Sequence, residues 1–549
     1  MNEQITTYQI SSLEKVYLDY KGPEKVINSI SLLRNERISY QVAYQSSNFP
    51  FRAEMKVSVD SPLKDFVSVR RVGNVPSQYP VRPPFDEHYE RYTPGLFPDV
   101  LYPLENDTIE AVSGVWHSLW ITLELDGTIP AGTYPIVLKL SGEGINIQKE
   151  MSVEIMDALL PEQDLIFTQW LHVDCLANYY QVPVYSEQHW ERIDQFVRTA
   201  AKYGINMVLV PIITPPLDTA VGHERTNVQL LDIVKKDDHY SFGFDRLRRF
   251  IRLCLKNGIQ YFEMSHLFTQ WGLKFTPNIY AEEDGCYKRI FGWDVEAEDE
   301  GYMCFLSQLL PKLDEVLVEE GVHKNTFFHI SDEPYSEHIE RYKVLREKIT
   351  AMLPQYTFID ALSVYDFYKQ GVVDKPIPAT NHIEPFIEAN APDLWCYYCC
   401  SQSQDVSNRF MALPSYRNRI IGLQFYKFDI KGFLHWGYNF YNSYLSKKHI
   451  DPFRVTDAID TYQSGDAFSV YPGEDGPIES MRLLIFYDAL QDLRALKLLE
   501  TYLGKEKVVA LLEDEAGMEI RFNQYPRSME YMLNVREKIN REIAIAISK

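Results

Sequence analysis

Two adjacent carboxylates, Asp332 and Glu333, come directly after an apolar run. The segment 326–334 reads Thr-Phe-Phe-His-Ile-Ser-Asp-Glu-Pro, so a predicted strand ends at the acidic pair and a proline stops it. Apolar surroundings raise the pKa of a carboxyl group, as a general acid that works near neutral pH requires. In substrate-assisted hydrolysis of a 2-acetamido sugar, one carboxylate orients the acetamido group while its neighbour protonates the leaving oxygen. The pair therefore predicts Asp332 as the group at the acetamido nitrogen and Glu333 as the acid/base.

The same residues allow other interpretations. Asp332 could cap a following helix, with Glu333 in its first turn. His329, Asp332 and Glu333 could bind a metal ion, but neighbouring strand residues point to opposite faces, and the sequence holds no H-E-x-x-H. A hydrolase nucleophile elbow lacks its G-x-S-x-G sequence. We therefore expect no metal and no cofactor.

Short apolar segments alternate with amphipathic ones from about residue 165 onward, which is typical of parallel β–α units. We expect an α/β fold of the (β/α)8 barrel type. The predicted strands are 165–172, 206–214, 259–267, 326–331, 357–362, 377–382, 394–399 and 432–438, and predicted helices between them include 187–203, 244–257, 302–320, 336–352 and 414–427. A doubly wound sheet is the alternative, but no glycine-rich phosphate turn follows these strands.

The rest of the chain predicts two further regions. Residues 1–160 hold alternating or short apolar runs broken by glycine and proline, which favours a β-sandwich domain. The barrel then takes residues 161–445. Residues 446–549 begin with a turn-rich stretch and continue with helical periodicity, so we expect a C-terminal segment of loops and helices packed on the barrel.

A sugar site needs an aromatic ring for stacking and polar side chains for the hydroxyl groups. Trp436 and Asn439 lie at the end of the last predicted strand, and we expect Trp436 to stack on a sugar face. Tyr398 is expected to donate a hydrogen bond to the acetamido oxygen. The other candidates lie at strand ends or in the loop after the last strand, namely Asn381, His382, His266, His172, Asp466 and Tyr471. For each of these residues, packing in the core or bracing a loop is the alternative role.

The composition points away from two classes of partner. A formal net charge of -22 over 549 residues disfavours nucleic acid and anionic membranes. The aromatic share is 13%, and such rings fill cores or stack on sugars. The N-terminus MNEQITTYQI lacks a secretory pattern, and the 7 cysteines fit reduced thiols. We expect a cytoplasmic protein whose partner is an oligosaccharide or glycoconjugate.

Three blocks of the sequence follow a known pattern. They are 329–334 (His-Ile-Ser-Asp-Glu-Pro), 432–439 (Gly-Phe-Leu-His-Trp-Gly-Tyr-Asn) and 465–482 (Gly-Asp-Ala-Phe-Ser-Val-Tyr-Pro-Gly-Glu-Asp-Gly-Pro-Ile-Glu-Ser-Met-Arg). Together they resemble glycoside hydrolase family 123, and pieces at 97–101, 119–122 and 131–134 are similar to the N-terminal sandwich of that family.

That resemblance implies an exo-acting β-N-acetylgalactosaminidase that retains configuration through an oxazoline intermediate. It implies Asp332 as the acetamido stabiliser and Glu333 as the acid/base. A glycosidase of another sugar specificity and an inactive carbohydrate-binding protein are the alternatives that the sequence leaves open.

Overall fold

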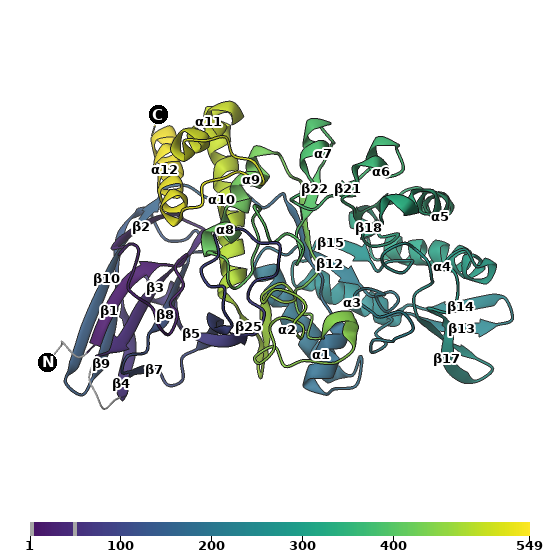
Figure 1. Cartoon of the computed structure of the whole chain (residues 1–549), viewed down its shortest axis with the longest axis horizontal. Coiled ribbons are helices and arrows are strands. Elements are labelled where there is room, and N and C mark those ends of the chain that lie inside the picture. The colour runs from purple at the N-terminus through teal and green to yellow at the C-terminus, as the bar shows by residue number, and fades with distance from the viewer. Residues whose placement is uncertain (1–4, 48–51, 549) are drawn as a thin grey trace.

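The computed structural model describes residues 5–47 and 52–548, and Figure 1 shows the whole chain. The N-terminal strands are β1 (Ile5–Ser11), β2 (Ser29–Leu33), β3 (Arg37–Ser46), β4 (Arg52–Asp60), β5 (Val67–Ser77), β6 (Gly95–Pro103), β7 (Thr108–Val112), β8 (His117–Glu124), β9 (Gly132–Gly142) and β10 (Ile145–Met156). They form two five-stranded sheets with the orders β1-β3-β8-β5-β6 and β2-β10-β9-β4-β7. Every pair is antiparallel except β10 with β2.

The two N-terminal sheets share one apolar cluster. It takes Ile121 from β8 of the first sheet and Leu138 from β9 of the second, so the sheets pack face to face. In β9 the buried residues are Ile136, Leu138 and Leu140, and the residues between them are half-buried. This period of two gives β9 one apolar face, as an antiparallel strand with one covered side requires.

A curled sheet of parallel strands occupies the middle of the chain. It contains β11 (Ile166–Gln169), β12 (Met207–Val210), β15 (Tyr261–Met264), β18 (Thr326–Phe328), β19 (Thr357–Phe358), β22 (Trp395–Tyr397) and β23 (Gly432–His435). The order is β19-β18-β15-β12-β11-β23-β22. Two short strands, β20 (Asp360–Ala361) and β21 (Pro376–Ile377), pair in parallel, and a parallel bridge joins Ala379 to Tyr397 of β22. Each of the eight strand segments predicted from sequence contains or overlaps one of these strands.

Both faces of the curled sheet are buried. Along β12, Met207 and Leu209 join the small apolar cluster inside the curl, while Val208 and Val210 join the large cluster that includes the surrounding helices. A parallel strand covered on both sides reads as a continuous apolar run, which is why the sequence of β12 does not alternate. The polar residues that follow each strand are then the ones left free for a site.

Helices connect the parallel strands. They are α1 (Val173–Tyr180), α2 (Glu187–Lys202), α3 (Asp245–Lys256), α4 (Glu300–Glu319), α5 (Ile339–Met352), α6 (Tyr365–Lys369), α7 (Glu384–Glu388), α8 (Ser415–Arg419) and α9 (Ile421–Lys427). Short 3-10 segments are η2 (Lys64–Phe66), η3 (His323–Asn325), η4 (Ser336–His338) and η5 (Tyr444–Ser446). Parallel neighbours need such crossovers, because a tight turn cannot return the chain to the same edge.

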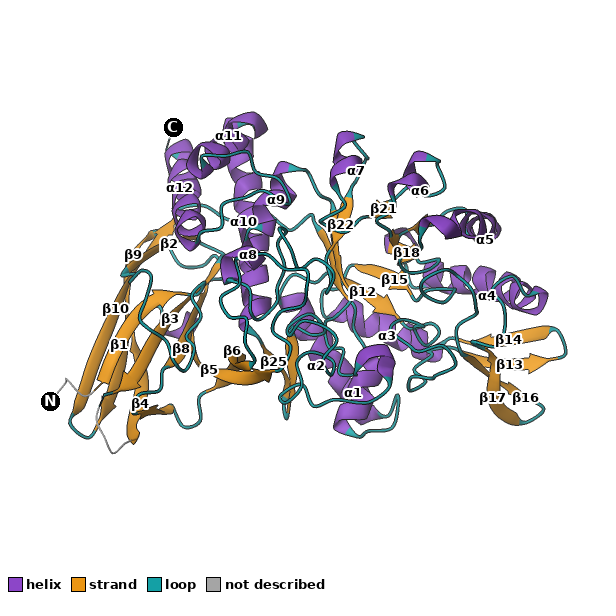
Figure 2. Ribbon diagram, in the orientation of Figure 1, coloured by secondary structure: helices purple, strands orange, loops and turns teal. Residues whose placement is uncertain are grey.

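Sequence reasoning did not anticipate one small sheet. Strands β13 (Asp232–Lys236), β14 (His239–Gly243), β16 (Ile279–Glu283) and β17 (Cys286–Phe291) form a four-stranded sheet with the order β14-β13-β16-β17. Figure 2 shows it at the end of the molecule opposite the N-terminal sheets. Its strands come from the two segments that follow β12 and β15, before the predicted helices at 244–257 and 302–320, where sequence reasoning named no element.

The C-terminal part joins the two regions. It contains β24 (Val470–Gly473), β25 (Gly476–Glu479), α10 (Met481–Leu503), α11 (Lys505–Ala516) and α12 (Met529–Ile547). Helix α10 packs on α8, α9 and β6, and α12 packs on β2, so these helices lie between the N-terminal sheets and the parallel strands (Figure 1). Among the residues that the structure describes, no helix has both the length and the apolar character for crossing a membrane.

Candidate active site

A cavity of about 280 Å³ lies at the carboxyl ends of the parallel strands. Each of several strands contributes the residues that follow it or end it, which is the arrangement that places functional groups in parallel β–α folds. The lining consists of Arg82, Trp170, Leu217, Asp218, Gln270, Trp271, Asp332, Glu333, Tyr335, Ala361, Tyr397, Cys399, Cys400, Ser401, Leu434, Trp436, Tyr444, Thr461 and Tyr462. The acidic pair predicted from sequence therefore lies in a cavity, beside aromatic side chains.

The acidic pair is half-buried and strongly perturbed. Burial raises the pKa of Asp332 well above its usual range, and the charge of Glu333 raises it further. Burial also raises the pKa of Glu333, although hydrogen bonds from Tyr397 and Trp271 oppose the shift. The Tyr397 hydroxyl donates to Glu333 Oε1 at 2.5 Å. The charge of Glu333 therefore opposes ionisation of Asp332, and the two carboxyls titrate as a pair.

The backbone holds these residues in an unusual conformation. Asp218, Trp271 and Glu333 all have positive φ, at 41°, 55° and 45°. Non-glycine residues adopt this left-handed region at a cost, and such outliers gather at functional sites. Hydrogen bonds hold two of them, since Glu333 N donates to Ala361 O and Trp271 N donates to Asp332 O, both at 3.0 Å. The strand next to the pair thus sets the direction of the Glu333 side chain.

The structure does not place Asp332 at a helix N-cap. The chain continues from Pro334 to the short segment η4 (Ser336–His338), and α5 begins at Ile339 with His338 as its N-cap residue. Asp332 and Glu333 therefore have no capping role, and both lie at the cavity instead.

A buried ion-pair network lies behind the acidic pair. His329 Nε2 is 2.8 Å from Glu263 Oε2, and His329 Nδ1 is 3.3 Å from Asp360 Oδ1. Burial opposes a charge on His329, but the hydrogen bonds with Asp360 and Glu263 outweigh burial and raise its pKa to about 9. The imidazolium is three residues from Asp332, and its charge works to lower the pKa of Asp332. Trp170 Nε1 donates to Glu263 at 3.1 Å and so connects this network to the cavity wall.

One group of side chains in the described part of the chain has the spacing of a metal site. Ligand atoms of His266, His329 and Asp360 lie within 4.8 Å of one another, and the two imidazole rings stack with centroids 4.2 Å apart. Both nitrogens of His329 are already paired with carboxylates. Two carboxylate partners suit a protonated His329 ring, and a metal ion could bind this ring only by replacing a proton.

The predicted binding residues fall into two groups. Trp436 lines the cavity, and its Nε1 donates to Asp466 Oδ2 at 3.0 Å. Asp466 is buried behind this ring, and burial raises its pKa to about 7. The remaining predicted residues lie outside the cavity lining, namely Tyr398, Asn439, Asn381, His382, His266, His172 and Tyr471.

Each residue outside the lining has a local reason for its position. Asn439 exchanges two hydrogen bonds with the backbone of His172, at 2.8 and 3.1 Å. Tyr471 donates to Asp99 at 2.5 Å, in the N-terminal region. The His266 ring is fully buried against His329, as noted above. Asn381 and His382 are exposed at the start of the loop before α7. Their roles at a substrate stay predictions.

Tyr398 and Tyr397 differ by one position on the same strand, and the face decides their surroundings. Trp395 and Tyr397 belong to the apolar cluster inside the curl, whereas Cys396 and Tyr398 belong to the cluster on the helix side. A shift of one residue moves a side chain to the opposite face of a sheet. Tyr397 is therefore the tyrosine at the carboxylates. Trp395 lies two residues earlier on the same face of the strand, so its inward position is the signal that would have identified Tyr397.

Sequence reasoning also missed Asp218, a third carboxyl in the cavity lining. The Tyr462 hydroxyl donates to Asp218 Oδ1 at 2.6 Å, and Asp218 Oδ2 has no hydrogen-bond partner among the described residues. Burial raises the pKa of Asp218 to about 6. Asp218 lies in an irregular proline-rich loop after β12, where no periodicity marks a strand end, so the sequence carried no clear signal for it.

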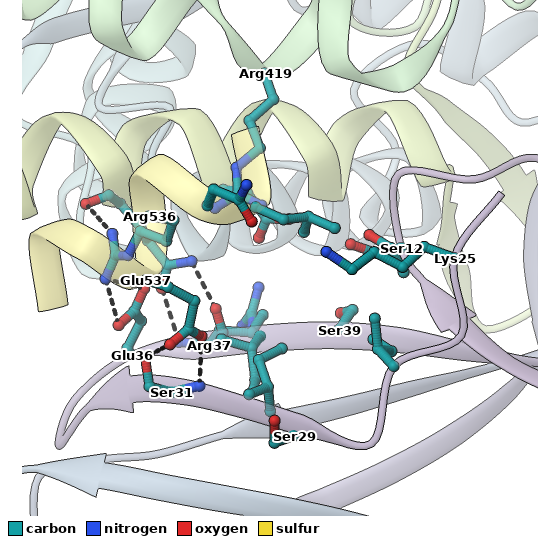
Figure 3. Close-up of a pocket in the computed structure, with 18 of the residues that line it drawn as sticks. Ser12, Lys25, Ser29, Ser31, Glu36, Arg37, Ser39, Arg419, Arg536 and Glu537 are labelled. Carbon is teal, nitrogen blue, oxygen red and sulfur yellow. Dashed lines mark hydrogen bonds and ion pairs between the residues drawn. The ribbon is translucent and has the colours of Figure 1, made fainter. Parts of the chain in front are cut away.

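A second cavity, of about 310 Å³, lies between the N-terminal sheets and helices α10 and α12 (Figure 3). Residues on opposite walls of this cavity bind each other. Arg536 forms an ion pair with Glu36 at 2.7 Å, and Glu537 accepts hydrogen bonds from the backbone and the hydroxyl of Ser31 at 2.9 and 2.8 Å. The acidic pair after β18 is not part of this lining. This cavity thus belongs to the junction between regions, and the acidic pair lines the smaller cavity.

Known proteins resemble this chain in sequence family and in fold. Residues 170–499 match the model of the family described as "Glycoside hydrolase 123, catalytic domain". A family 123 glycoside hydrolase from Clostridium perfringens, solved in work on glycolipid glycan hydrolysis, is 13% identical with a TM-score of 0.75, over 99% of this chain and 97% of that chain. A family 5 mannosidase from Rhizomucor miehei is 12% identical with a TM-score of 0.35, over 63% and 94% of the two chains. No curated protein sequence matches this chain.

Proposed function

We propose, because this chain belongs to glycoside hydrolase family 123, that it removes terminal β-linked N-acetylgalactosamine from an oligosaccharide or glycoconjugate with retention of configuration. The observation that carries the proposal is the acidic pair after β18. Asp332 and Glu333 are neighbours in the chain, both line one cavity, and burial raises the pKa of both. A 2-acetamido sugar is the substrate class that gives two adjacent carboxyls separate tasks.

The first step of the proposed reaction uses the acetamido group as nucleophile. Its oxygen attacks the anomeric carbon, the glycosidic bond breaks, and Glu333 gives its proton to the departing oxygen. The Asp332 carboxylate accepts a hydrogen bond from the acetamido N–H and stabilises the positive charge of the oxazoline. In the second step Glu333 takes a proton from water. The water attacks the anomeric carbon from the face that the leaving group left, and the oxazoline ring opens. Two inversions at one carbon leave its configuration unchanged.

The proposed reaction needs an ionised Asp332 and a protonated Glu333. The His329 imidazolium works to lower the pKa of Asp332, and a substrate N–H that donates to Asp332 would favour its ionised form in the same way. Without substrate the shifts run the other way, because burial and the charge of Glu333 raise the pKa of Asp332 well above its usual range, whereas Tyr397 and Trp271 stabilise ionised Glu333. The acetamido N–H of the substrate is therefore what moves the proton to Glu333, the group that acts as acid. Tyr397 holds Glu333 by its Oε1 atom.

The cavity offers the contacts that a sugar ring needs. Trp436, Trp170 and Trp271 supply aromatic surface, and the free oxygen of Asp218 can accept a hydroxyl group. The strand pairing supports the (β/α)8 arrangement for this site. It runs from β11 through β12, β15, β18 and β19, and the β20–β21 pair with the Ala379–Tyr397 bridge spans the gap to β22 and β23.

The proposal is tested by measuring hydrolysis of nitrophenyl β-N-acetylgalactosaminide. The corresponding β-galactoside, which lacks the acetamido group, serves as the comparison substrate. We expect turnover of the first substrate and little of the second. The NMR spectrum of the reaction should show the β-anomer of the released sugar before the α-anomer. Equal turnover of the two substrates would rule out assistance by the acetamido group.

Replacement of Trp436 by alanine is expected to weaken substrate binding. Loss of a buried aromatic contact costs about 1.5–3 kcal/mol, which corresponds to a rise in KM of about ten- to a hundredfold. Steady-state kinetics would measure this rise. Tyr502→Ala, at an exposed aromatic residue of α10 outside the cavity lining, is the control that should leave KM unchanged. An unchanged KM in Trp436→Ala would remove this ring from the binding site.

Replacement of Tyr397 by phenylalanine is expected to move the alkaline limb of the pH profile. The hydroxyl of Tyr397 stabilises ionised Glu333, so its loss raises the pKa of Glu333. A hydrogen bond to a charged group is worth about 1.5–3 kcal/mol, so the alkaline limb of kcat/KM should move up by roughly one to two pH units. Tyr398→Phe is the matched control, because that hydroxyl faces Asn418 outside the cavity lining. A limb that stays in place, or moves down, would contradict the acid role of Glu333.

A further inference from the structure

Two adjacent thiols lie on the wall of the same cavity as the acidic pair. Cys399 and Cys400 follow the end of β22 after one intervening residue, both are partly exposed, and both line the cavity. The neighbouring Cys400 thiol and burial raise the pKa of the Cys399 thiol well above its usual range. Arg82 donates from Nη1 to the Cys400 sulfur at 3.7 Å. The two cysteines therefore reach one cavity from consecutive positions of the chain.

The other cysteines of the chain do not form such a pair. Cys175, Cys254 and Cys396 are buried. Cys286 and Cys304 are accessible, but one belongs to β17 and the other to α4, and neither has a cysteine beside it in the chain. Among the described residues, Cys399 and Cys400 are thus the adjacent pair that a ligand in a cavity can reach.

The backbone of the pair is anchored on several sides. Cys399 N donates to Gln402 Oε1 at 2.8 Å, and Asn408 Nδ2 donates to Cys399 O at 2.9 Å. The backbone of Cys400 works to lower the pKa of Asp466, the carboxyl that also accepts a hydrogen bond from Trp436. A group bound to the two sulfurs would therefore sit in a fixed place near Trp436.

We propose that Cys399 and Cys400 form a dithiol site for trivalent arsenic compounds on the wall of the cavity. Sulfur ligands prefer soft centres, and two of them on one rigid segment bind such a centre as a chelate. With an organic arsenic oxide, two S–H bonds break and two As–S bonds form. The oxygen takes both protons and leaves as water, and arsenic stays trivalent. No oxidant or reductant is needed, and the high pKa of Cys399 is no obstacle because the departing oxygen accepts the proton.

The consequence for catalysis rests on the proposed function. The lining of the cavity includes the two sulfur atoms together with Glu333 and Trp436, so a bridging arsenic group would occupy space that a sugar needs. Bound arsenic is expected to inhibit hydrolysis, and a saturating substrate is expected to slow its binding.

Binding is tested on the full chain with phenylarsine oxide. We expect one arsenic group per chain by intact mass, with the loss of two free thiols, and peptide mapping should place the group at 399–400. Cys399→Ser and Cys400→Ser should each weaken binding about 100-fold, the low end of the gain from two linked contacts. Cys286→Ser and Cys304→Ser are the controls that should bind like the unchanged protein. A dithiol reagent should remove the group, whereas a monothiol should not.

Two outcomes would overturn the proposal. One is equal binding by the unchanged protein and the two serine variants at 399 and 400. The other is a label that maps to Cys286 or Cys304. Both are read from mass and thiol counts, so they do not depend on hydrolysis. If arsenic binds at 399–400 and no sugar is hydrolysed by the untreated protein, the dithiol site stands and the proposed function fails.

Discussion

Replacement of Glu333 by glutamine is expected to lower kcat/KM by about 10²–10⁴-fold on a substrate with a sugar or alkyl leaving group. General acid catalysis contributes about this factor, and glutamine keeps the shape of the side chain while losing the proton. A nitrophenyl leaving group departs with little protonation, so the loss on that substrate should be much smaller. Steady-state kinetics on both substrates would measure the difference.

The contrast between leaving groups is what identifies the role of Glu333. Equal losses on both substrates would indicate a binding or folding role, and an unchanged rate on the sugar-linked substrate would contradict the mechanism. Glu337→Gln is the matched control, since this glutamate lies four residues on with an exposed side chain that pairs only with His338 in the described structure. That variant should retain the rate of the unchanged protein on both substrates.

Replacement of His329 by leucine is expected to lower the free energy of unfolding by about 3–5 kcal/mol. The imidazolium lies between Glu263 and Asp360, and all three side chains are fully buried or nearly so. Removal of one member of a buried ion pair leaves uncompensated charge in a place without water. Denaturant unfolding at neutral pH would measure the loss.

His266→Leu is the matched control for this prediction. The His266 ring stacks on His329 and is equally buried, but neither of its nitrogens has a hydrogen-bond partner among the described residues. A similar-sized apolar side chain should therefore change the free energy of unfolding by less than about 1.5 kcal/mol. Equal effects of the two leucine variants would mean that packing, and not charge, explains the loss.

The pH dependence of stability offers an independent check on His329. Its pKa is raised from 6.5 to about 9 in the folded protein, so its contribution is fully present below pH 6.5 and is lost as the pH rises through about 9. The shift corresponds to about 3 kcal/mol. The stability difference between the unchanged protein and His329→Leu should therefore shrink over this interval. A difference that grows would contradict a protonated His329 in the folded protein.

The strands of the curled sheet were predictable because of their local pattern. Each is a short apolar run that ends in polar residues, and both faces of such a strand are buried. That pattern led to Asp332 and Glu333. Together with three sequence blocks it also led to a family resemblance that the match over residues 170–499 confirms. The face on which a residue points depends on register, so Tyr397 was missed in favour of Tyr398.

Contacts between distant parts of the chain were not predictable from one sequence. Asp99 of β6 accepts two hydrogen bonds from Arg482 of α10, both at 2.9 Å, and another from Tyr471. These residues are more than 370 positions apart, as the pairing of Asp99 with Tyr471 shows. Tyr471 was therefore placed at a substrate by its position after a strand, whereas it joins the N-terminal sheets to the C-terminal part. Its sequence block is structural support for the loop that carries Asp466.

Loops whose residues adopt left-handed backbone conformations also could not be predicted from the sequence. Asp218 and Trp271 reach the cavity through backbone conformations that neither residue type favours. Hydrogen bonds from neighbouring loops hold them, as Asp218 N donates to Gln270 Oε1 at 2.5 Å. Periodicity and turn signals describe favoured conformations, so a site built on disfavoured ones leaves little trace in the sequence.

The central claim is that the acetamido group of the substrate is the nucleophile, and one inhibition constant tests it most directly. The thiazoline derived from N-acetylgalactosamine mimics the oxazoline and should inhibit hydrolysis competitively. Analogues of a high-energy state bind at least about 100-fold more tightly than ground-state ligands, so the thiazoline should surpass N-acetylgalactosamine itself by that factor. A thiazoline that binds no better than N-acetylgalactosamine would contradict the account.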